Sequence, residues 1–238
     1  MTIRKKHPAI TGSRATKAPA KALAAKTPAR SRGRPPADDA PALRARLLDA
    51  ALACYVRAGI AATSLRDIAA EAGVTPAMLH YYFGDRAQLR QAVIDERILP
   101  ALAAVQAPLQ DAGDDVAALV AGFVGGIGRV VAAHPWLPPL WVREILSEGG
   151  ALRDVMFDSI GPRLPVMMAG RFAEAQRRGA LNPDLDPRLL MVSLVGLTLF
   201  PAAGASIWQR LFDAGDLDFE ALRRHTLALL DRGLELGA

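Results

Sequence analysis

One short stretch near the start of the chain constrains the fold most, because it encodes two brief helices separated by a tight turn. Ser64 and Asp67 form the S-x-x-D signature of a helix N-terminus, and Gly73 ends that helix after barely two turns. Thr75 then offers an N-cap hydroxyl to the next helix, and Pro76 occupies a position whose N–H has no helical partner in any case. Two short helices joined in this way predict a helix-turn-helix.

Helical patterns flank this stretch on both sides. Apolar residues recur at helical spacing over 41–58 up to a stop at Gly59, and Asp85 with Gln88 caps a longer helix that Pro100 is expected to interrupt. No strand alternation is found, so the sequence predicts an all-α fold, with a helix-turn-helix domain followed by a larger helical domain. The later helical segments are expected at 114–133, 138–148, 151–178, 187–210 and 218–236.

Charge is distributed unevenly along the chain. The net charge is +5, from 29 Lys+Arg and 24 Asp+Glu, but ten of the basic residues and no acid lie in residues 1–36. Residues 1–40 also hold almost no large apolar side chain, so they are expected to be disordered when free. A mitochondrial transit peptide has a similar composition, but the prolines oppose its amphipathic helix. We expect a basic arm over 1–40, a helix-turn-helix domain over 41–90 and a larger helical domain over 91–238.

The second helix of a helix-turn-helix lies in the major groove of DNA, with its N-terminal residues facing the base edges. Residues 81–83 are three successive aromatic residues, Tyr-Tyr-Phe, and on a helix they cannot all face one core. We therefore expect Tyr81 to point outward and Phe83 to lie in the core. The alternative is that all three form a hydrophobic plug beneath the helices. Ser64, Arg66 and Arg86 are candidate phosphate contacts, with a solvated surface as the alternative. The candidate contacts on the second helix itself are Thr75, Pro76, Ala77, His80 and Tyr81, among which His80 is equally consistent with an idle surface residue.

The motif as a whole resembles a known family. Residues 63–74, T-S-L-R-D-I-A-A-E-A-G-V, and the residues after them up to Arg86 are similar to the DNA-binding domain of TetR-family transcriptional regulators. The resemblance covers about residues 43–90, and it implies an all-helical regulator that binds DNA and responds to a small molecule. His80 stands where the family commonly has tyrosine, and Arg86 where it commonly has lysine, so the geometry of that phosphate contact differs.

The basic arm contains a second candidate DNA element. Residues 31–36, S-R-G-R-P-P, resemble an AT-hook core, in which Arg32 and Arg34 would lie in a narrow A·T-rich minor groove. A merely solvated basic tail is the alternative. In either case the ten cations should condense on DNA phosphates, and affinity should fall steeply with salt.

Specific binding by a helix-turn-helix generally needs two units on a palindromic site, so we expect a homodimer. The resemblance implies that segments 187–210 and 218–236 pair across a two-fold axis into a four-helix bundle. Residues 189–208 carry no charge and are long enough to cross a bilayer. Their Gly, Pro, Ser and Thr content favours a helix buried between protein surfaces, and we expect no membrane association.

Large, adaptable apolar residues mixed with a few charged ones fill the middle of the chain, as in small-molecule pockets. The resemblance implies an effector pocket there, although each residue is also consistent with plain core. The candidate lining residues are Phe123, Ile127, His134, Trp141, Glu144, Met167 and Phe172. The glycines at 122, 125, 126 and 128 would admit a ligand or a close neighbour, or mark a bend.

Signatures of catalysis and metal binding are missing from the sequence. It has no G-x-x-x-x-G-K-[ST] loop and no G-x-S-x-G elbow, and its four histidines are widely separated. Cys54, the single cysteine, excludes a disulfide framework and suits a reducing cytoplasm. We therefore expect no enzyme, no metal and no cofactor, but a DNA-binding regulator, most simply a ligand-responsive repressor. The alternatives are an architectural nucleoid protein without an effector and, third, an enzyme.

Overall fold

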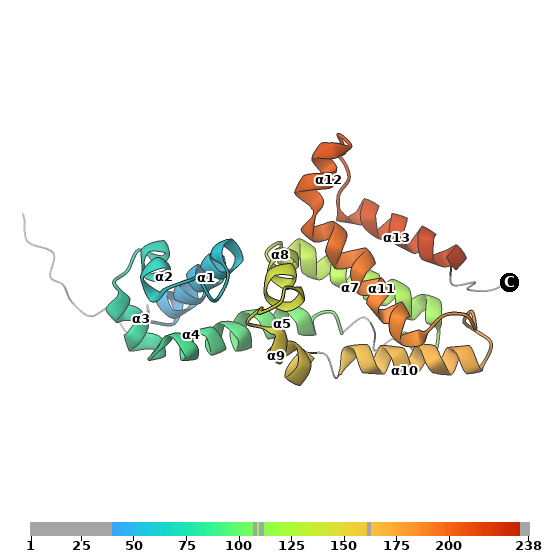
Figure 1. Cartoon of the computed structure of the whole chain (residues 1–238), viewed down its shortest axis with the longest axis horizontal. Coiled ribbons are helices and arrows are strands. Elements are labelled where there is room, and N and C mark those ends of the chain that lie inside the picture. The colour runs from blue at the N-terminus through green and yellow to red at the C-terminus, as the bar shows by residue number, and fades with distance from the viewer. Residues whose placement is uncertain (1–39, 107–108, 110–111, 161–162, 234–238) are drawn as a thin grey trace, which may run out of the picture. The chain divides into compact units, whose positions relative to one another are not determined.

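The chain folds into helices over the residues that the structure, a computed structural model, describes: 40–106, 109, 112–160 and 163–233 (Figure 1). No strand occurs in these ranges, which confirms the expected all-α class. The helices, with η for π-helical segments, are α1 Ala40–Ala58, α2 Leu65–Ala72, α3 Pro76–Phe83, α4 Arg86–Val93, η2 Ile94–Ile98, α5 Leu99–Ala103, α7 Val116–Ala133, α8 Leu137–Trp141, η3 Val142–Leu146, α9 Arg153–Val155, η4 Met156–Ile160, α10 Leu164–Arg177, α11 Pro187–Ala203, α12 Ala205–Leu211 and α13 Phe219–Gly233. Residues 1–39 of the expected arm, with Arg32 and Arg34, lie outside the described residues.

The turn between α2 and α3 forms as the sequence predicts. The Asp67 N–H donates to Ser64 Oγ at 3.2 Å, and the Ser64 N–H donates to Asp67 Oδ2 at 2.8 Å, which completes a capping box. Gly73 has a φ of 68°, a conformation that other residues rarely adopt. Thr75 is the N-cap of α3, but the prediction that its hydroxyl caps the helix is wrong. The Met78 N–H donates to the backbone carbonyl of Thr75 at 3.0 Å instead.

Helices α1 to α4 share one hydrophobic core. Leu47, Ile68 and Leu79 are completely or almost completely buried in it, and each such side chain contributes about 1.5–3 kcal/mol relative to exposure. Phe83 is also buried, as expected, and Cys54 is a small core residue. The shared core holds α3 in a fixed position relative to α1 and α2.

Tyr55 lies in this core with a hydroxyl that has no hydrogen-bond partner among the described residues. Burial raises the pKa of the phenol, and an unpaired buried hydroxyl costs about 1–3 kcal/mol. Tyr55→Phe should therefore leave the free energy of unfolding unchanged or raise it by about 1 kcal/mol. Tyr55→Ala should lower it by about 3–5 kcal/mol. Urea unfolding followed by circular dichroism measures both, and a clear loss in Tyr55→Phe would show that the hydroxyl is paired.

The fourth helix does not stop at Pro100, so that expectation is wrong: α4, η2 and α5 form one continuous helix. In η2 the helix is widened, since the Leu99 N–H donates to the Ile94 carbonyl five residues earlier. Pro100 has no N–H for the Glu96 carbonyl, and the Arg97 side chain donates to that carbonyl at 3.1 Å. The widened turn and the arginine together compensate for the proline.

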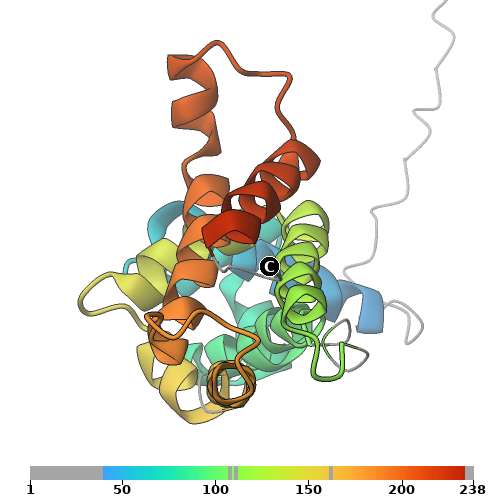
Figure 2. The ribbon, with the colours of Figure 1, turned by 90° about the vertical axis from the view of Figure 1, so that its right-hand side faces the viewer.

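In the C-terminal part, α7 packs against α10, α11 and α13 (Figure 2). By length and composition alone α7 could cross a membrane, but half of it is buried within the fold, as in a core helix. Phe123 and Val124 are buried at its centre. At Gly128 a Cβ would lie 2.2 Å from the Phe219 ring of α13, so this glycine admits a close neighbour.

Two helices that the sequence predicts as continuous are interrupted. Residues 151–178 divide into α9, η4 and α10, and Pro165 stands in the first turn of α10, where a missing N–H costs little. Residues 187–210 bend by 71° between α11 and α12, next to Gly204. Pro201 lies inside the last turn of α11, and its carbonyl accepts from Trp208 Nε1 at 2.8 Å, which fixes the bend.

Candidate DNA-binding surface and ligand cavity

The outer side of α3 is a continuous exposed surface. All the residues expected there are exposed, or nearly so, namely Thr75, Pro76, Ala77, His80 and Tyr81. Tyr81 is 70% exposed and meets the half-buried Tyr82 edge to face, with ring centroids 5.3 Å apart. The aromatic residues therefore divide as the sequence predicts, with Tyr81 outside and Phe83 in the core.

His80 is exposed, and its side chain is hydrogen-bonded to the turn that follows α3. Its Nδ1 lies 2.6 Å from the carbonyl oxygen of Gly84, so Nδ1–H donates there and Nε2 is left as the acceptor in the neutral ring. The bond ties the side chain to the residue that ends α3. His80 is thus oriented by the turn between α3 and α4.

Ser64 and Arg66 stand at the start of α2, and both are exposed. The Ser64 hydroxyl donates to Asp67 Oδ2 at 2.6 Å, and its hydrogen bonds with Ser64 lower the pKa of the Asp67 carboxyl. The hydroxyl is therefore already used in the capping box. Arg66 carries the positive charge at this end of the helix.

Arg86, expected at a phosphate, also has a role within the fold. Its Nη2 donates to the carbonyls of Ile60 and Ala61, each at 2.7 Å. These residues belong to the loop between α1 and α2, and Arg86 begins α4. The guanidinium therefore joins that loop to the helix that follows α3, a contact over 25 residues or more that no local pattern in the sequence indicates.

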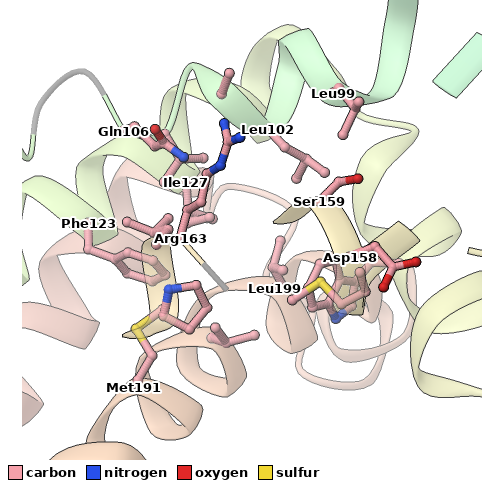
Figure 3. A pocket seen from close by; sticks show the side chains of 17 residues that line it. Leu99, Leu102, Gln106, Phe123, Ile127, Asp158, Ser159, Arg163, Met191 and Leu199 are labelled. Atoms are coloured by element: carbon pink, nitrogen blue, oxygen red, sulfur yellow. The ribbon is translucent and has the colours of Figure 1, made fainter. Parts of the chain in front are cut away.

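A cavity of about 400 Å³ lies between α5, α7, η4 and α11 (Figure 3). Three of the expected lining residues, Phe123, Ile127 and Trp141, contribute to its wall. Sequence reasoning missed most of the others, which come from segments far apart in the chain. The missed residues include Leu99, Leu102, Gln106, Asp158, Ser159, Arg163, Met191, Val195 and Leu199.

The polar groups of the cavity lie at different places on its wall. Figure 3 shows the Arg163 guanidinium near Gln106, and the Asp158 carboxylate on another side. Apolar side chains form most of the surface between them. Such a cavity suits a small, mainly apolar molecule with one or two polar groups.

The remaining expected lining residues lie elsewhere. His134 borders a separate pocket with Asp49 and Arg97. Phe172 is wholly buried in the C-terminal core, and Met167 is partly exposed on α10 and does not line the cavity. Helical spacing cannot separate a cavity wall from ordinary core, which accounts for these positions.

Glu144, also expected in the pocket, is buried beside the helix-turn-helix. Its Oε1 accepts from the Ile60 N–H at 2.9 Å, and its Oε2 accepts from the Ala151 N–H at 3.0 Å. The neighbouring Arg143 donates from Nη1 to the Arg57 carbonyl at 2.8 Å. The η3 segment is thereby fastened to the end of α1 and to the loop after it.

An exposed apolar stripe runs along α11. Leu189, Val192 and Phe200 are 63%, 66% and 73% exposed, and the exposed Gly196 completes their helical row. We call these four residues the α11 stripe. On the adjacent α13, Leu229 is 53% exposed, so an uncovered apolar surface lies on both segments expected in the dimer interface.

Known proteins match both parts of the chain. Residues 47–93 match the family model for bacterial regulatory proteins of the tetR family. The HTH-type transcriptional repressor SCO4008 of Streptomyces coelicolor is 25% identical over 187 residues, which span 79% of this chain and 92% of SCO4008.

Solved structures share the fold. The ketosteroid transcriptional regulator KstR2 of Mycobacterium tuberculosis superposes with a TM-score of 0.65 and 19% identity, over 80% of this chain and 94% of KstR2. The SmeT–triclosan complex has a TM-score of 0.56 and 21% identity, over 82% of this chain and 93% of SmeT. The chain therefore belongs to the TetR family: it is a DNA-binding transcriptional regulator with an N-terminal helix-turn-helix, of a non-enzymatic family whose members are typically ligand-responsive repressors.

Proposed function

We propose that this protein is a cytoplasmic homodimeric repressor that binds an inverted-repeat operator and leaves it when a small apolar molecule fills the cavity. The observation that carries the proposal is the exposed outer surface of α3, backed by the buried Leu79 and Phe83. A rigid inner side and a free outer side are what a reading helix in the major groove requires.

The proposed DNA contacts fall into two groups. Thr75, Ala77 and Tyr81 lie toward the base edges and the neighbouring phosphates, while Arg66 and Arg86 lie toward the backbone. Arg86 binds the α1–α2 loop through Nη2, so we propose that its other guanidinium N–H groups face the phosphate. Ser64 Oγ, His80 Nε2 and Pro76 complete the surface.

The dimer is proposed to form through the α11 stripe and α13. A two-fold interface places the same apolar surface of each copy against the other, and the α11 stripe is the kind of exposed apolar surface that such packing would cover. Two reading helices held in this way would address half-sites about 34–36 Å apart.

The effector is proposed to be mainly apolar, because apolar side chains such as Phe123, Ile127 and Leu199 form most of the cavity wall. Two of the similar proteins support this proposal: SCO4008 is a transcriptional repressor, and the SmeT structure is a complex with triclosan, a small molecule. We also propose that residues 1–40 form an arm that contacts DNA, that residues 41–90 form the DNA-binding domain and that residues 91–238 form the regulatory domain. The continuous helix from α4 to α5 joins the last two.

Selection of bound fragments from a random DNA pool by the purified protein tests this function. The expected product is a discrete inverted repeat. Footprinting on that repeat should show protection that a mainly apolar small molecule from a compound screen relieves. Coating that depends on DNA length and ignores sequence would instead support an architectural protein.

Tyr81→Ala is expected to lower the affinity for the selected operator at least about 100-fold, because a hydrogen bond to a charged group contributes about 1.5–3 kcal/mol and the dimer loses two. The exposed ring contributes little to folding, so the free energy of unfolding should fall by no more than about 1 kcal/mol. Tyr81→Phe keeps the ring and separates the contribution of the hydroxyl. Fluorescence anisotropy and thermal unfolding provide the two measurements, and a collapse of folding would place Tyr81 in the core.

A further inference from the structure

Glu144 is the one charged side chain that is buried among the described residues, at 4% exposure. Burying a carboxylate is costly unless hydrogen bonds satisfy it. No ion pair among the described residues includes Glu144, and its carboxylate accepts from the backbone N–H groups of Ile60 and Ala151. An apolar side chain would leave the N–H groups of Ile60 and Ala151 without their acceptor. The carboxylate is therefore a specific link from η3 to the α1–α2 loop and to the residues before α9.

One of the two hydrogen bonds of Glu144 reaches the helix-turn-helix domain. The Ile60 N–H binds Glu144, and the Ile60 carbonyl accepts from Arg86 at the start of α4. Gly59 has a φ of 88°, and a Cβ there would lie 3.1 Å from Glu144 Oε1, so the loop approaches the carboxylate closely. Displacing Glu144 would release the loop that Arg86 joins to α4, on the C-terminal side of α3.

The chain segments on either side of Glu144 and of its second partner, Ala151, lead to the cavity. Trp141 lines the cavity one helical turn before Glu144, and its buried Nε1 has no hydrogen-bond partner among the described residues. On the other side, Ala151 leads into η4, from which Met156 and Asp158 line the same cavity. Glu144 therefore stands between two wall segments, and a shift of either moves its carboxylate relative to Ile60.

We propose that Glu144 is the positioning residue through which the filling of the cavity changes the placement of α3 on DNA. The inference rests on the proposed function, in which the cavity controls DNA binding. With the cavity empty, Glu144 holds the α1–α2 loop and α4 in the arrangement that binds the operator. When Trp141 or Met156 is pushed outward, the hydrogen bond to Ile60 breaks and the reading helices lose their spacing.

A double-mutant cycle in the full-length protein tests this coupling without a known effector. Ile127→Trp fills the cavity from α7, a helix that holds neither Glu144 nor its hydrogen-bond partners, and Leu102→Trp fills it from α5 as a second variant. Each should lower affinity for the selected operator about 10-fold, within the usual range of allosteric coupling. In the Glu144→Ala background the same substitutions should change affinity less than about 2-fold.

Two further variants separate coupling from general destabilisation. Glu144→Gln keeps a carbonyl oxygen that can accept from Ile60, so it should restore most of the response to cavity filling. Glu148→Ala removes an exposed acid from the same region and should leave the response at its full size. Circular dichroism establishes that each variant is folded before its affinity is compared.

The outcomes are distinct. If Ile127→Trp and Leu102→Trp weaken DNA binding equally with and without Glu144, the cavity controls DNA binding by another route and the inference about Glu144 is wrong. If both folded variants bind the operator as the unmodified protein does, the cavity is not coupled to DNA, and the effector part of the proposed function falls with the inference.

Discussion

Val192→Glu is expected to convert the dimer into monomers. Val192 lies in the α11 stripe and is 66% exposed. In a two-fold interface each substitution introduces two carboxylates, one from each copy. A buried charge without a partner costs several kcal/mol, so the dissociation constant of the dimer should rise at least about 1000-fold, because every 1.4 kcal/mol is a factor of ten. Analytical ultracentrifugation measures the change directly.

Val166→Glu provides the matched control. Val166 lies on α10 and is 65% exposed, so the two sites differ in position but hardly in exposure or residue type. Val166→Glu should remain dimeric and bind the operator normally, whereas Val192→Glu should bind a single half-site weakly. If Val192→Glu remained dimeric, the α11 stripe would not be part of the dimer interface.

The turns of the helix-turn-helix could be predicted because the contacts that form them are local. Ser64 and Asp67 are three residues apart, and the left-handed conformation at Gly73 follows from the residue type alone. The same holds for Asp85, whose carboxylate accepts from the Gln88 N–H at 2.8 Å. Patterns of this range also carry the resemblance to the family.

The connection between the two parts of the chain could not be predicted in the same way. Glu144 and Ile60 are 84 residues apart, and Arg86 binds carbonyls 25 and 26 residues earlier. Backbone carbonyls and N–H groups carry no sequence signature, so a side chain that binds them at long range looks like any other charged residue. The sequence pattern accordingly places Glu144 at the pocket, whereas its actual partners lie beside the helix-turn-helix.

The cavity could be predicted only in part, for a similar reason. Phe123 and Phe172 have the same residue type and both lie on apolar helix faces, yet one lines the cavity and the other is wholly packed. The difference depends on how α7, α10 and α11 pack together. Pro100 shows the same dependence on context, because a widened turn and the side chain of Arg97 let the helix continue.

Removal of residues 1–36 is expected to flatten the salt dependence of operator binding more than any change within the folded part. The expectation rests on the ten cations of this segment. Each phosphate contact contributes about 0.9 to the slope of log affinity against log salt concentration, so full engagement would reduce the slope by about 9 for each protomer of the bound dimer. Titrations from low to physiological salt measure the slope for both proteins, and equal slopes would mean that the arm does not contact DNA.

The R-G-R-P core can be separated from the rest of the arm by matched charge loss. Arg32→Ala with Arg34→Ala removes two cations, as does Lys17→Ala with Lys21→Ala, and all four sites lie in the same segment. Each pair should reduce the salt slope by about 2 for each protomer of the dimer if every side chain contacts a phosphate. Guanidinium groups inserted into a narrow minor groove also respond to the sequence there, so only the arginine pair should abolish a preference for A·T-rich DNA beside the inverted repeat. If both pairs affected that preference equally, the arm would contact DNA only through its total positive charge, and the R-G-R-P core would have no specific role.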